Sequence, residues 1–301
     1  MKRETRYALE SAALSAARSI ARVVPRSLFI RLGRSLGALT AAVDGKHREI
    51  AKDNLRRSFP DWSETEIDRV ARAVWVHFGG VMFDLVRLLA RGPAMIPPLV
   101  TLEGREHAES ARSSGRGVVI VTAHFGNWEA HGIAHGQTFG SIGVVARPLD
   151  NPAFDRVMTA LREGAGNEVI AKEHAMIRSM RRIKEGRGVA FLVDQNVQAK
   201  EGIFVNFFGR PACTTPFAAK LAIRTGAMVL PCRTVMTDDF RYRVIYDAPI
   251  DPKAFVESDE GVRALTQAMV DTTERWIRSN PEQWLWMHRR WHTKPPSPAA
   301  P

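Results

Sequence analysis

Cysteine is scarce in this sequence. Only Cys213 and Cys232 occur among 301 residues, so no disulfide framework is expected, and low cysteine usage is typical of proteins that face a reducing compartment. The sequence also lacks a cysteine cluster and a His-Glu-x-x-His motif, which are common signatures of zinc sites. His131 and His135 are four residues apart, a spacing that packing on one helix face explains without a metal. We therefore predict no metal site.

A long uninterrupted apolar run is also missing. A membrane-spanning helix needs about 18 or more apolar residues, and the N-terminal stretch that comes closest is interrupted by Glu10, Arg18 and Arg22. The same charges break the apolar region that a secretory signal peptide requires. Apolar residues nevertheless recur here at helical spacing. This pattern fits either a basic amphipathic helix lying on a membrane or an ordinary helix docked on the domain.

Acidic residues are too few to balance the basic ones, which leaves a formal net charge of +11 and a pI near 10.2. Such a surface attracts nucleic acid, anionic lipid headgroups, phosphorylated substrates or an acidic carrier protein, and charge alone does not choose among them. A hydrophobic fraction of 45% and a charged fraction of 25% are ordinary for a folded protein. They exclude global disorder and suffice for one large domain or two small ones.

The first third of the chain has a helical pattern. Residues 4–92 carry apolar side chains at helical spacing, with a new helix starting at Pro25 and another stopping at Pro60. Ser63 and Glu66 have the spacing of a capping box, in which each side chain binds the other residue's backbone N–H at a helix start. We therefore expect several helices before the first strand.

From about residue 99 the pattern alternates between strands and helices. Continuous apolar runs at 117–122 and 188–193 predict strands buried on both faces. The other expected strands are 99–102, 142–146, 228–235 and 242–246, and the expected helices are 127–137, 154–163, 175–185, 217–224 and 260–278. This alternation predicts an α/β fold, with a largely parallel mixed sheet flanked by helices and an N-terminal helical subdomain.

His124 and Glu129 form the strongest candidate for chemistry. His124 lies just beyond the buried strand at 117–122, where sites in open α/β sheets collect, and Glu129 follows in the next helix. A turn at Gly126 can adopt unusual dihedrals and bring the carboxylate back to the imidazole. A carboxylate on one ring nitrogen leaves the other free to act as a general base. The alternative is a polar strand end followed by a glutamate that the helix dipole favours at a helix start.

Two more charged residues lie at the ends of predicted elements. Arg162 precedes a glycine-containing loop and is placed either to bind a phosphate or to end a helix in solvent. Asp194 ends the buried strand at 188–193, where it serves either the same site as His124 or an Asx turn.

Other motifs favour packing over function. Residues 33–37 match the Gly-x-Ser-x-Gly nucleophile elbow but lie in a helical segment without the strand that the elbow requires. No Walker or Rossmann phosphate loop is present. The segment 284–291 mixes tryptophan with cations, which suits base stacking, a membrane interface or core packing, and packing is the default.

Taken together, these segments resemble the lipid A biosynthesis acyltransferases, a family of lauroyl and myristoyl transferases within the glycerolipid acyltransferase superfamily. The resemblance spans about residues 20–292 in the family's order. Its matching segments are 54–60, 124–129, 146–152, 194–196, 205–211 and 284–291.

The resemblance implies a single-step transfer. A fatty acyl thioester, usually on acyl carrier protein, would donate its chain to a hydroxyl of a lipid A precursor, without an acyl-enzyme and without a cofactor. His124 would deprotonate the hydroxyl, with Glu129 orienting the imidazole. Arg162 would contact phosphate or an oxyanion, and Asp194 would support the architecture of the site.

The resemblance also implies an arrangement of domains and a location. We expect a membrane-associating helical subdomain at 1–98, an α/β acyltransferase domain at 99–294 and a disordered tail at 295–301. The net charge suits the cytoplasmic face of a bacterial inner membrane, whose anionic surface the protein would bind peripherally because its N-terminal region carries charges.

The sequence leaves the acceptor open. A lysophospholipid, an aminolipid or a mannosylated phosphatidylinositol would use the same chemistry. A different class of function is a basic protein that binds nucleic acid or membranes without catalysis. No recognisable nucleic-acid module is present, so we predict no nucleic-acid partner.

Overall fold

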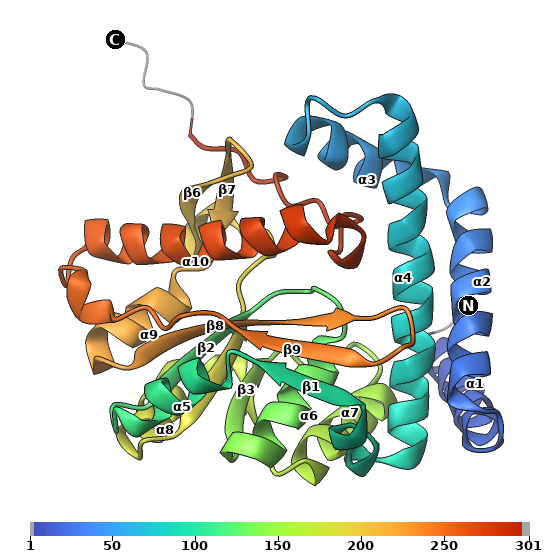
Figure 1. Ribbon diagram of the computed structural model, residues 1–301, viewed down its shortest axis with the longest axis horizontal. Coiled ribbons are helices and arrows are strands. Elements are labelled where there is room, and N and C mark those ends of the chain that lie inside the picture. The colour runs from blue at the N-terminus through green and yellow to red at the C-terminus, as the bar shows by residue number, and fades with distance from the viewer. Residues whose placement is uncertain (1–2, 297–301) are drawn as a thin grey trace.

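The computed structural model describes residues 3–296. Its N-terminal part is helical, as predicted, and its helices are α1 (Arg3–Val23), α2 (Arg26–Val43), α3 (Gly45–Ser58) and α4 (Glu64–Arg91). Pro25 precedes α2, and α3 ends before Pro60. The capping box at the start of α4 is formed in both directions between Ser63 and Glu66. Figure 1 shows α4 rising between the sheet and the outer pair α1 and α2.

Helices α2 and α4 cross at very close range through glycine. A Cβ atom on Gly33 would lie 2.5 Å from the carbonyl oxygen of Gly79, and one on Gly37 would lie 2.2 Å from that of Trp75. Because glycine has no side chain, the two backbones can touch directly at these positions. The Gly-x-Ser-x-Gly match at 33–37 is thus a helix-packing surface, as expected from its helical context.

Helix α1 is docked on the rest of the molecule. Arg18 donates to the carbonyl of Leu89 over 3.1 Å, and Asn151 donates to Glu10 over 2.9 Å. Among the described helices, α4 is the one long and apolar enough to cross a membrane by length and composition, whereas the sequence pointed to the N-terminal stretch as the nearest approach. Within the fold, α4 packs against α1, α2 and α3.

Within residues 3–296, seven strands form the main sheet in the order β1-β9-β8-β2-β5-β3-β4. All neighbouring pairs are parallel except β8 and β9. The sheet is therefore mixed and largely parallel, as predicted. The strands are β1 (Val100–Glu103), β2 (Val118–Thr122), β3 (Ile142–Ala146), β4 (Glu168–Ala171), β5 (Gly188–Leu192), β8 (Met228–Met236) and β9 (Tyr242–Tyr246).

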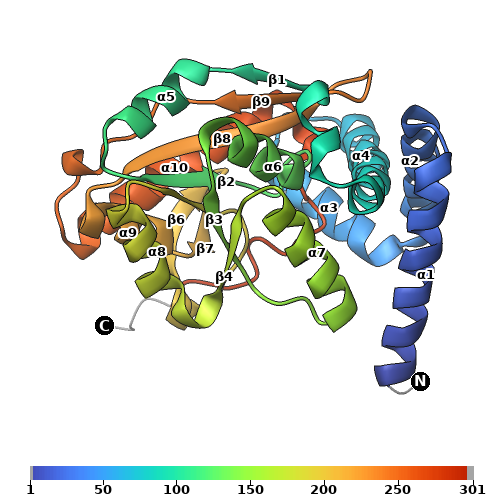
Figure 2. The ribbon, with the colours of Figure 1, turned by 90° about the horizontal axis from the view of Figure 1, so that it is seen from below.

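Helices cover both faces of the sheet (Figures 1 and 2). Alternate residues of β2 pack to opposite sides, because side chains alternate along a strand: Ile120 joins one core and Val121 the other. The first core includes α5 (Arg105–Ser113) and α6 (Trp128–Phe139) together with the N-terminal helices. The second includes α8 (Ala175–Lys184), α9 (Phe217–Thr225) and α10 (Asp259–Ser279). Helix α7 (Pro152–Gly164) follows β3 and contacts α4.

Four of the described elements were not predicted from the sequence: α5, the short edge strand β4, and the two strands of a hairpin, β6 (Ile203–Phe207) and β7 (Arg210–Thr214). The hairpin turns at Phe208 and Gly209, which both have positive φ, 51° and 70°. Two successive positive φ angles are typical of a tight hairpin turn, but phenylalanine is rare there. This is why the turn was hidden in the sequence. The predicted tail lies mostly outside the described residues.

The C-terminal aromatic segment belongs to the core. Trp284 and Trp286 are buried, and Trp291 is nearly so. Arg290 is fully buried, and its guanidinium donates to the carbonyl of Cys213 over 2.8 Å. These rings are packed inside the protein and do not offer a stacking face to nucleic acid bases, so the packing interpretation is confirmed.

Candidate active site

Parallel pairing of β2 and β5 brings two polar side chains together at one edge of the sheet. Thr122 pairs with Leu192 at the ends of these strands. His124 and Asp194 each lie two residues further on. Because the strands are parallel neighbours, their carboxyl ends meet at the same edge, where sites in such sheets collect.

His124 is bonded to Asp194 at two places. The Nδ1 atom of the imidazole lies 2.9 Å from Oδ1 of Asp194, and the backbone N–H of His124 donates to Oδ2 over 2.9 Å. An ionised carboxylate accepts only, so Nδ1 carries the proton and Nε2 is left as the basic nitrogen. Trp284 also binds this carboxylate, donating its indole N–H to Oδ2 of Asp194 over 2.8 Å.

These contacts shift the protonation of both groups. Burial alone would raise the pKa of Asp194, but His124 and Trp284 stabilise the anion and lower that pKa to about 2. Burial alone would lower the pKa of His124, but the charge and hydrogen bond of Asp194 outweigh it, and the pKa is raised. Glu129 adds a smaller electrostatic contribution in the same direction. The imidazole is therefore a stronger base than a free histidine.

The C-terminal segment fixes the loop that carries Asp194. The backbone N–H of Asn196 donates to Nε2 of His288 over 2.9 Å, and Arg290 donates to the carbonyl of Gln195 over 3.3 Å. On the other side, Asn54 of α3 donates to the carbonyl of Trp286 over 2.9 Å. The buried tryptophan segment thus clamps the strand-end loop against the helical layer.

The loop between His124 and α6 requires glycine at position 126. Gly126 has a φ of 56°, and a Cβ atom there would lie 1.8 Å from the carbonyl oxygen of Thr234. The next residue, Asn127, is the N-cap of α6 and accepts from the backbone N–H of Ala130 over 3.1 Å. The tight turn expected at Gly126 is confirmed.

Glu129 does not bond to His124, contrary to the expectation that it orients the imidazole. Its carboxylate receives the Arg162 guanidinium, with Nη2 to Oε1 at 2.6 Å and Nε to Oε2 at 3.1 Å. Asp194, expected only to support the site, takes the orienting position. The reason is topological, because neighbouring strand ends bring Asp194 to Nδ1, while the first turn of α6 aims Glu129 at α7.

This pairing also changes the expectation for Arg162. Its side chain is only 18% exposed, and two of its nitrogens are bonded to Glu129. Burial would lower the pKa of Arg162, but the charge of Glu129 outweighs burial and raises it. The guanidinium is a neutralised partner of a carboxylate, which leaves less of it for a substrate phosphate.

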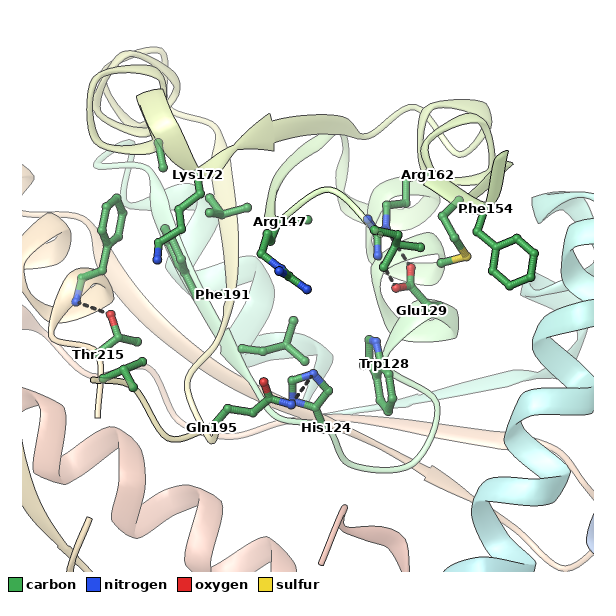
Figure 3. Close-up of a pocket in the computed structure, with 18 of the residues that line it drawn as sticks. His124, Trp128, Glu129, Arg147, Phe154, Arg162, Lys172, Phe191, Gln195 and Thr215 are labelled. Carbon is green, nitrogen blue, oxygen red and sulfur yellow. Dashed lines mark hydrogen bonds and ion pairs between the residues drawn. The ribbon is translucent and has the colours of Figure 1, made fainter. Parts of the chain in front are cut away.

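A cavity of about 1050 Å³ opens in front of His124, at the upper end of the size of small-molecule sites. One side is apolar and comes from α1, α4 and α7, with Leu14, Met82, Leu85, Val86, Leu89, Phe154 and Met158. The other side carries cations, with Arg147, Lys172 and Lys220. Figure 3 shows His124 and Gln195 at the floor, with Arg147 extending into the space above them.

Two more side chains frame the basic nitrogen. The amide nitrogen of Gln195 lies 3.3 Å from Nε2 of His124, and the ring of Trp128 meets the imidazole edge-on with centroids 4.9 Å apart. The sequence placed Gln195 only within the family-matching segment 194–196, and Trp284 only within the aromatic segment 284–291, for which packing was the default. Their contacts with His124 and Asp194 span 71 and 90 residues, and no local pattern marks such a distance.

The other histidines of α6 are buried packing residues. His131 lies against Cys232, 3.0 Å from Nε2 to Sγ, and His135 bonds to the hydroxyl of Tyr246 over 3.0 Å. Burial lowers the pKa of both, to about 4 for His131 and about 3 for His135. Within residues 3–296 no group of three or more His, Cys, Asp or Glu side chains is arranged to hold a metal ion.

Known proteins with similar sequences are acyltransferases. A lipid A biosynthesis acyltransferase of Haemophilus influenzae is 26% identical over 88% of this chain and 81% of its own length. The lipid A biosynthesis lauroyltransferase of Escherichia coli is 27% identical over 90% of this chain and 88% of its own. A phosphatidylinositol mannoside acyltransferase of Mycolicibacterium smegmatis is 26% identical over 85% and 83%. Residues 2–293 match the model of one family, and this chain is therefore an acyltransferase of the bacterial lipid A biosynthesis acyltransferase family.

Proposed function

We propose that the protein transfers a fatty acyl chain from a thioester to a hydroxyl of a lipid A precursor or related glycolipid, with His124 as general base. The observation that carries this proposal is the His124–Asp194 pair, whose imidazole lies at the floor of a large cavity lined mostly by apolar side chains. A carboxylate on Nδ1 fixes the tautomer and stabilises the imidazolium that forms during the reaction.

The proton has a complete route in this scheme. Nε2 of His124 takes the proton of the acceptor hydroxyl as its oxygen attacks the thioester carbonyl. The carbon–sulfur bond then breaks, and the imidazolium returns the proton to the leaving thiolate. The products are an ester and a free thiol. Gln195 is placed beside Nε2, so the incoming hydroxyl takes over the hydrogen bond that the amide makes to the ring.

The two sides of the cavity suit the two parts of such a reaction. The side lined by α4 and α7 includes Leu85, Phe154 and Met158 and is apolar enough for a hydrocarbon chain. The opposite side carries Arg147, Lys172 and Lys220, which suits an anionic group such as an acceptor phosphate. We assign the phosphate to these cations in preference to Arg162, because Arg162 is already paired with Glu129.

A membrane surface is the natural source of the acceptor. One face of α2 carries a stripe of apolar side chains at helical spacing, each about half exposed or more: Leu28, Leu32, Leu36, Leu39 and Val43. Figure 2 places α1 and α2 at the outer edge of the molecule, away from the sheet. We propose that this stripe dips into the anionic inner membrane at its cytoplasmic face, and that an acidic acyl carrier protein delivers the thioester to the basic protein.

The deciding experiment is an acyl-transfer assay of His124→Ala with His107→Ala as control. His107 lies on α5, away from the cavity lining. Loss of the general base should lower kcat by at least ~10²-fold, while the control keeps its activity. Near-normal kcat in folded His124→Ala protein would overturn the mechanism.

The same assay should compare acceptors and donors. We expect a phosphorylated lipid A precursor to be acylated, and its dephosphorylated form to bind more weakly. A lysophospholipid or a phosphatidylinositol mannoside acylated faster than both would correct the acceptor. Coenzyme A thioesters that outperform acyl carrier protein thioesters would correct the donor. No transfer to any acceptor from an intact protein would instead favour a non-catalytic membrane-binding relative.

A further inference from the structure

A chain of buried hydrogen bonds runs from the helical layer to the loop that follows His124. Arg26, the first residue of α2, is paired with Asp84 of α4 by two bonds, Nε to Oδ1 at 2.9 Å and Nη2 to Oδ2 at 2.5 Å. The hydroxyl of Tyr242 on β9 donates to the same carboxylate. The side-chain amide of Asn127 donates in turn to the Tyr242 oxygen over 2.9 Å.

Each link has only one sensible direction. A carboxylate accepts and a guanidinium donates, so the hydroxyl of Tyr242 must donate its hydrogen bond to Asp84. Burial and the charge of Asp84 raise the pKa of Tyr242 well above its ordinary value, so the phenol keeps that proton. The phenol oxygen then accepts from Asn127, which orients the asparagine amide with its oxygen toward the first turn of α6.

That orientation matters for the active site. The oxygen of Asn127 caps α6 by accepting from Ala130. The first two residues of the capped helix are Trp128, which packs on the imidazole of His124, and Glu129, which holds Arg162. A flipped or displaced Asn127 would release the cap and move the wall of the cavity beside the base.

We propose that Arg26, Asp84 and Tyr242 are positioning residues that hold the His124 loop in its active geometry, so that acyl transfer depends on the docking of α2 and α4. This inference rests on the proposed role of His124. It connects the helix that carries the apolar stripe to the reacting centre, since Arg26 begins that helix.

Tyr246 supplies a matched control. Tyr242 and Tyr246 lie four positions apart on the same strand, so their side chains are on the same face, and both are almost completely buried. Both bond to α6, but Tyr246 bonds to His135 in the second half of the helix, whereas Tyr242 bonds to its N-cap. Phenylalanine at either position removes one hydroxyl and keeps the ring.

The experiment compares Tyr242→Phe with Tyr246→Phe in the full-length protein. We expect similar losses of thermal stability in the two variants. We expect kcat to fall by about tenfold in Tyr242→Phe only, with KM for the acyl donor little changed. The reason is that small displacements near a general base lower the rate of the chemical step. Equal kcat values in the two variants would overturn the proposal while leaving the His124→Ala result intact.

A double-mutant cycle identifies the route of the effect. Serine caps a helix with a hydroxyl that rotates freely, so Asn127→Ser removes the need for Tyr242 to orient an amide. We expect Tyr242→Phe to lower kcat by less than about twofold when serine occupies position 127. A full tenfold loss in that background would show that Tyr242 acts by another route and would overturn the chain as drawn.

Discussion

Replacing Asp194 by asparagine tests the electrostatics of His124, the proposed base, directly. Asn has the same shape, but one of its two terminal atoms is an NH₂ group. Asp194 accepts three hydrogen bonds, from the imidazole Nδ1, the backbone N–H of His124 and the indole of Trp284. Two of these converge on Oδ2, so the asparagine oxygen takes that place and its NH₂ faces Nδ1. The imidazole must then accept at Nδ1 and carry its proton on Nε2, which is the wrong tautomer for a base.

The size of the effect follows from the geometry. At an effective dielectric constant of about 20, unit charges 2.9 Å apart attract by roughly 6 kcal/mol. Burial opposes this attraction, but the charge and hydrogen bond of Asp194 outweigh it. Removing the charge of Asp194 therefore lowers the pKa of His124. We expect kcat/KM to fall by ~10²-fold or more as well.

The assay is the pH dependence of kcat/KM for acyl transfer. A base must be neutral to work, and Asp194 raises the pKa of His124, so activity in the unchanged protein should rise with pH with a midpoint above the ordinary histidine value of about 6.5. In Asp194→Asn the residual activity should rise at lower pH. A rise at unchanged pH, or activity close to normal, would refute the assignment of Asp194 as the partner of the base.

Two further predictions concern the ion pair and the outer helix. Glu129→Gln leaves the buried Arg162 without its carboxylate, so the free energy of unfolding should fall by about 3 kcal/mol. It should fall by less in the double variant Glu129→Gln, Arg162→Gln, which has no unpaired charge. Additive losses of the two single variants in thermal unfolding would contradict this. Leu36→Asp should weaken binding to anionic vesicles by about tenfold, because burying one leucine contributes roughly 1.5–3 kcal/mol. Ser35→Asp adds the same charge on the neighbouring exposed position and should bind more tightly than Leu36→Asp; equal binding in sedimentation would contradict a role for the stripe.

Much of the fold was predictable from local patterns. The sequences of β2 and β5 are apolar almost throughout because helices cover both faces of the sheet, and such runs are a clear signal of buried strands. The α4 capping box and the Pro25 helix start follow from chemistry within four residues. The hairpin of β6 and β7 could not be predicted in this way, because its turn places Phe208 in a conformation usually taken by glycine or asparagine.

The structure brings together the residues named from the sequence, but it pairs them differently from the expectation. His124, Glu129, Arg162 and Asp194 all come together at the cavity or beside it. Because Glu129 is close to His124 in the chain, we expected it to orient the imidazole. The loop after His124 and the first turn of α6 direct its carboxylate to Arg162 instead. The contact with Asp194 spans 70 residues and exists only because β2 and β5 are neighbours. Strand order is a property of the whole sheet, and no single segment encodes it.

The exchange of partners has a consequence for substrate binding. Had Glu129 served the imidazole, Arg162 would be the strong cation of the cavity. Because Glu129 and Arg162 neutralise each other, the charged group next to the imidazole of His124 is the Asp194 carboxylate. An anionic acceptor therefore needs other cations. Arg147 and Lys172 are well exposed, and their ion pairs with Asp150 and Glu201 are long, 3.6 and 3.3 Å. Exposed pairs of that kind contribute little, so a phosphate can replace these carboxylates at small cost.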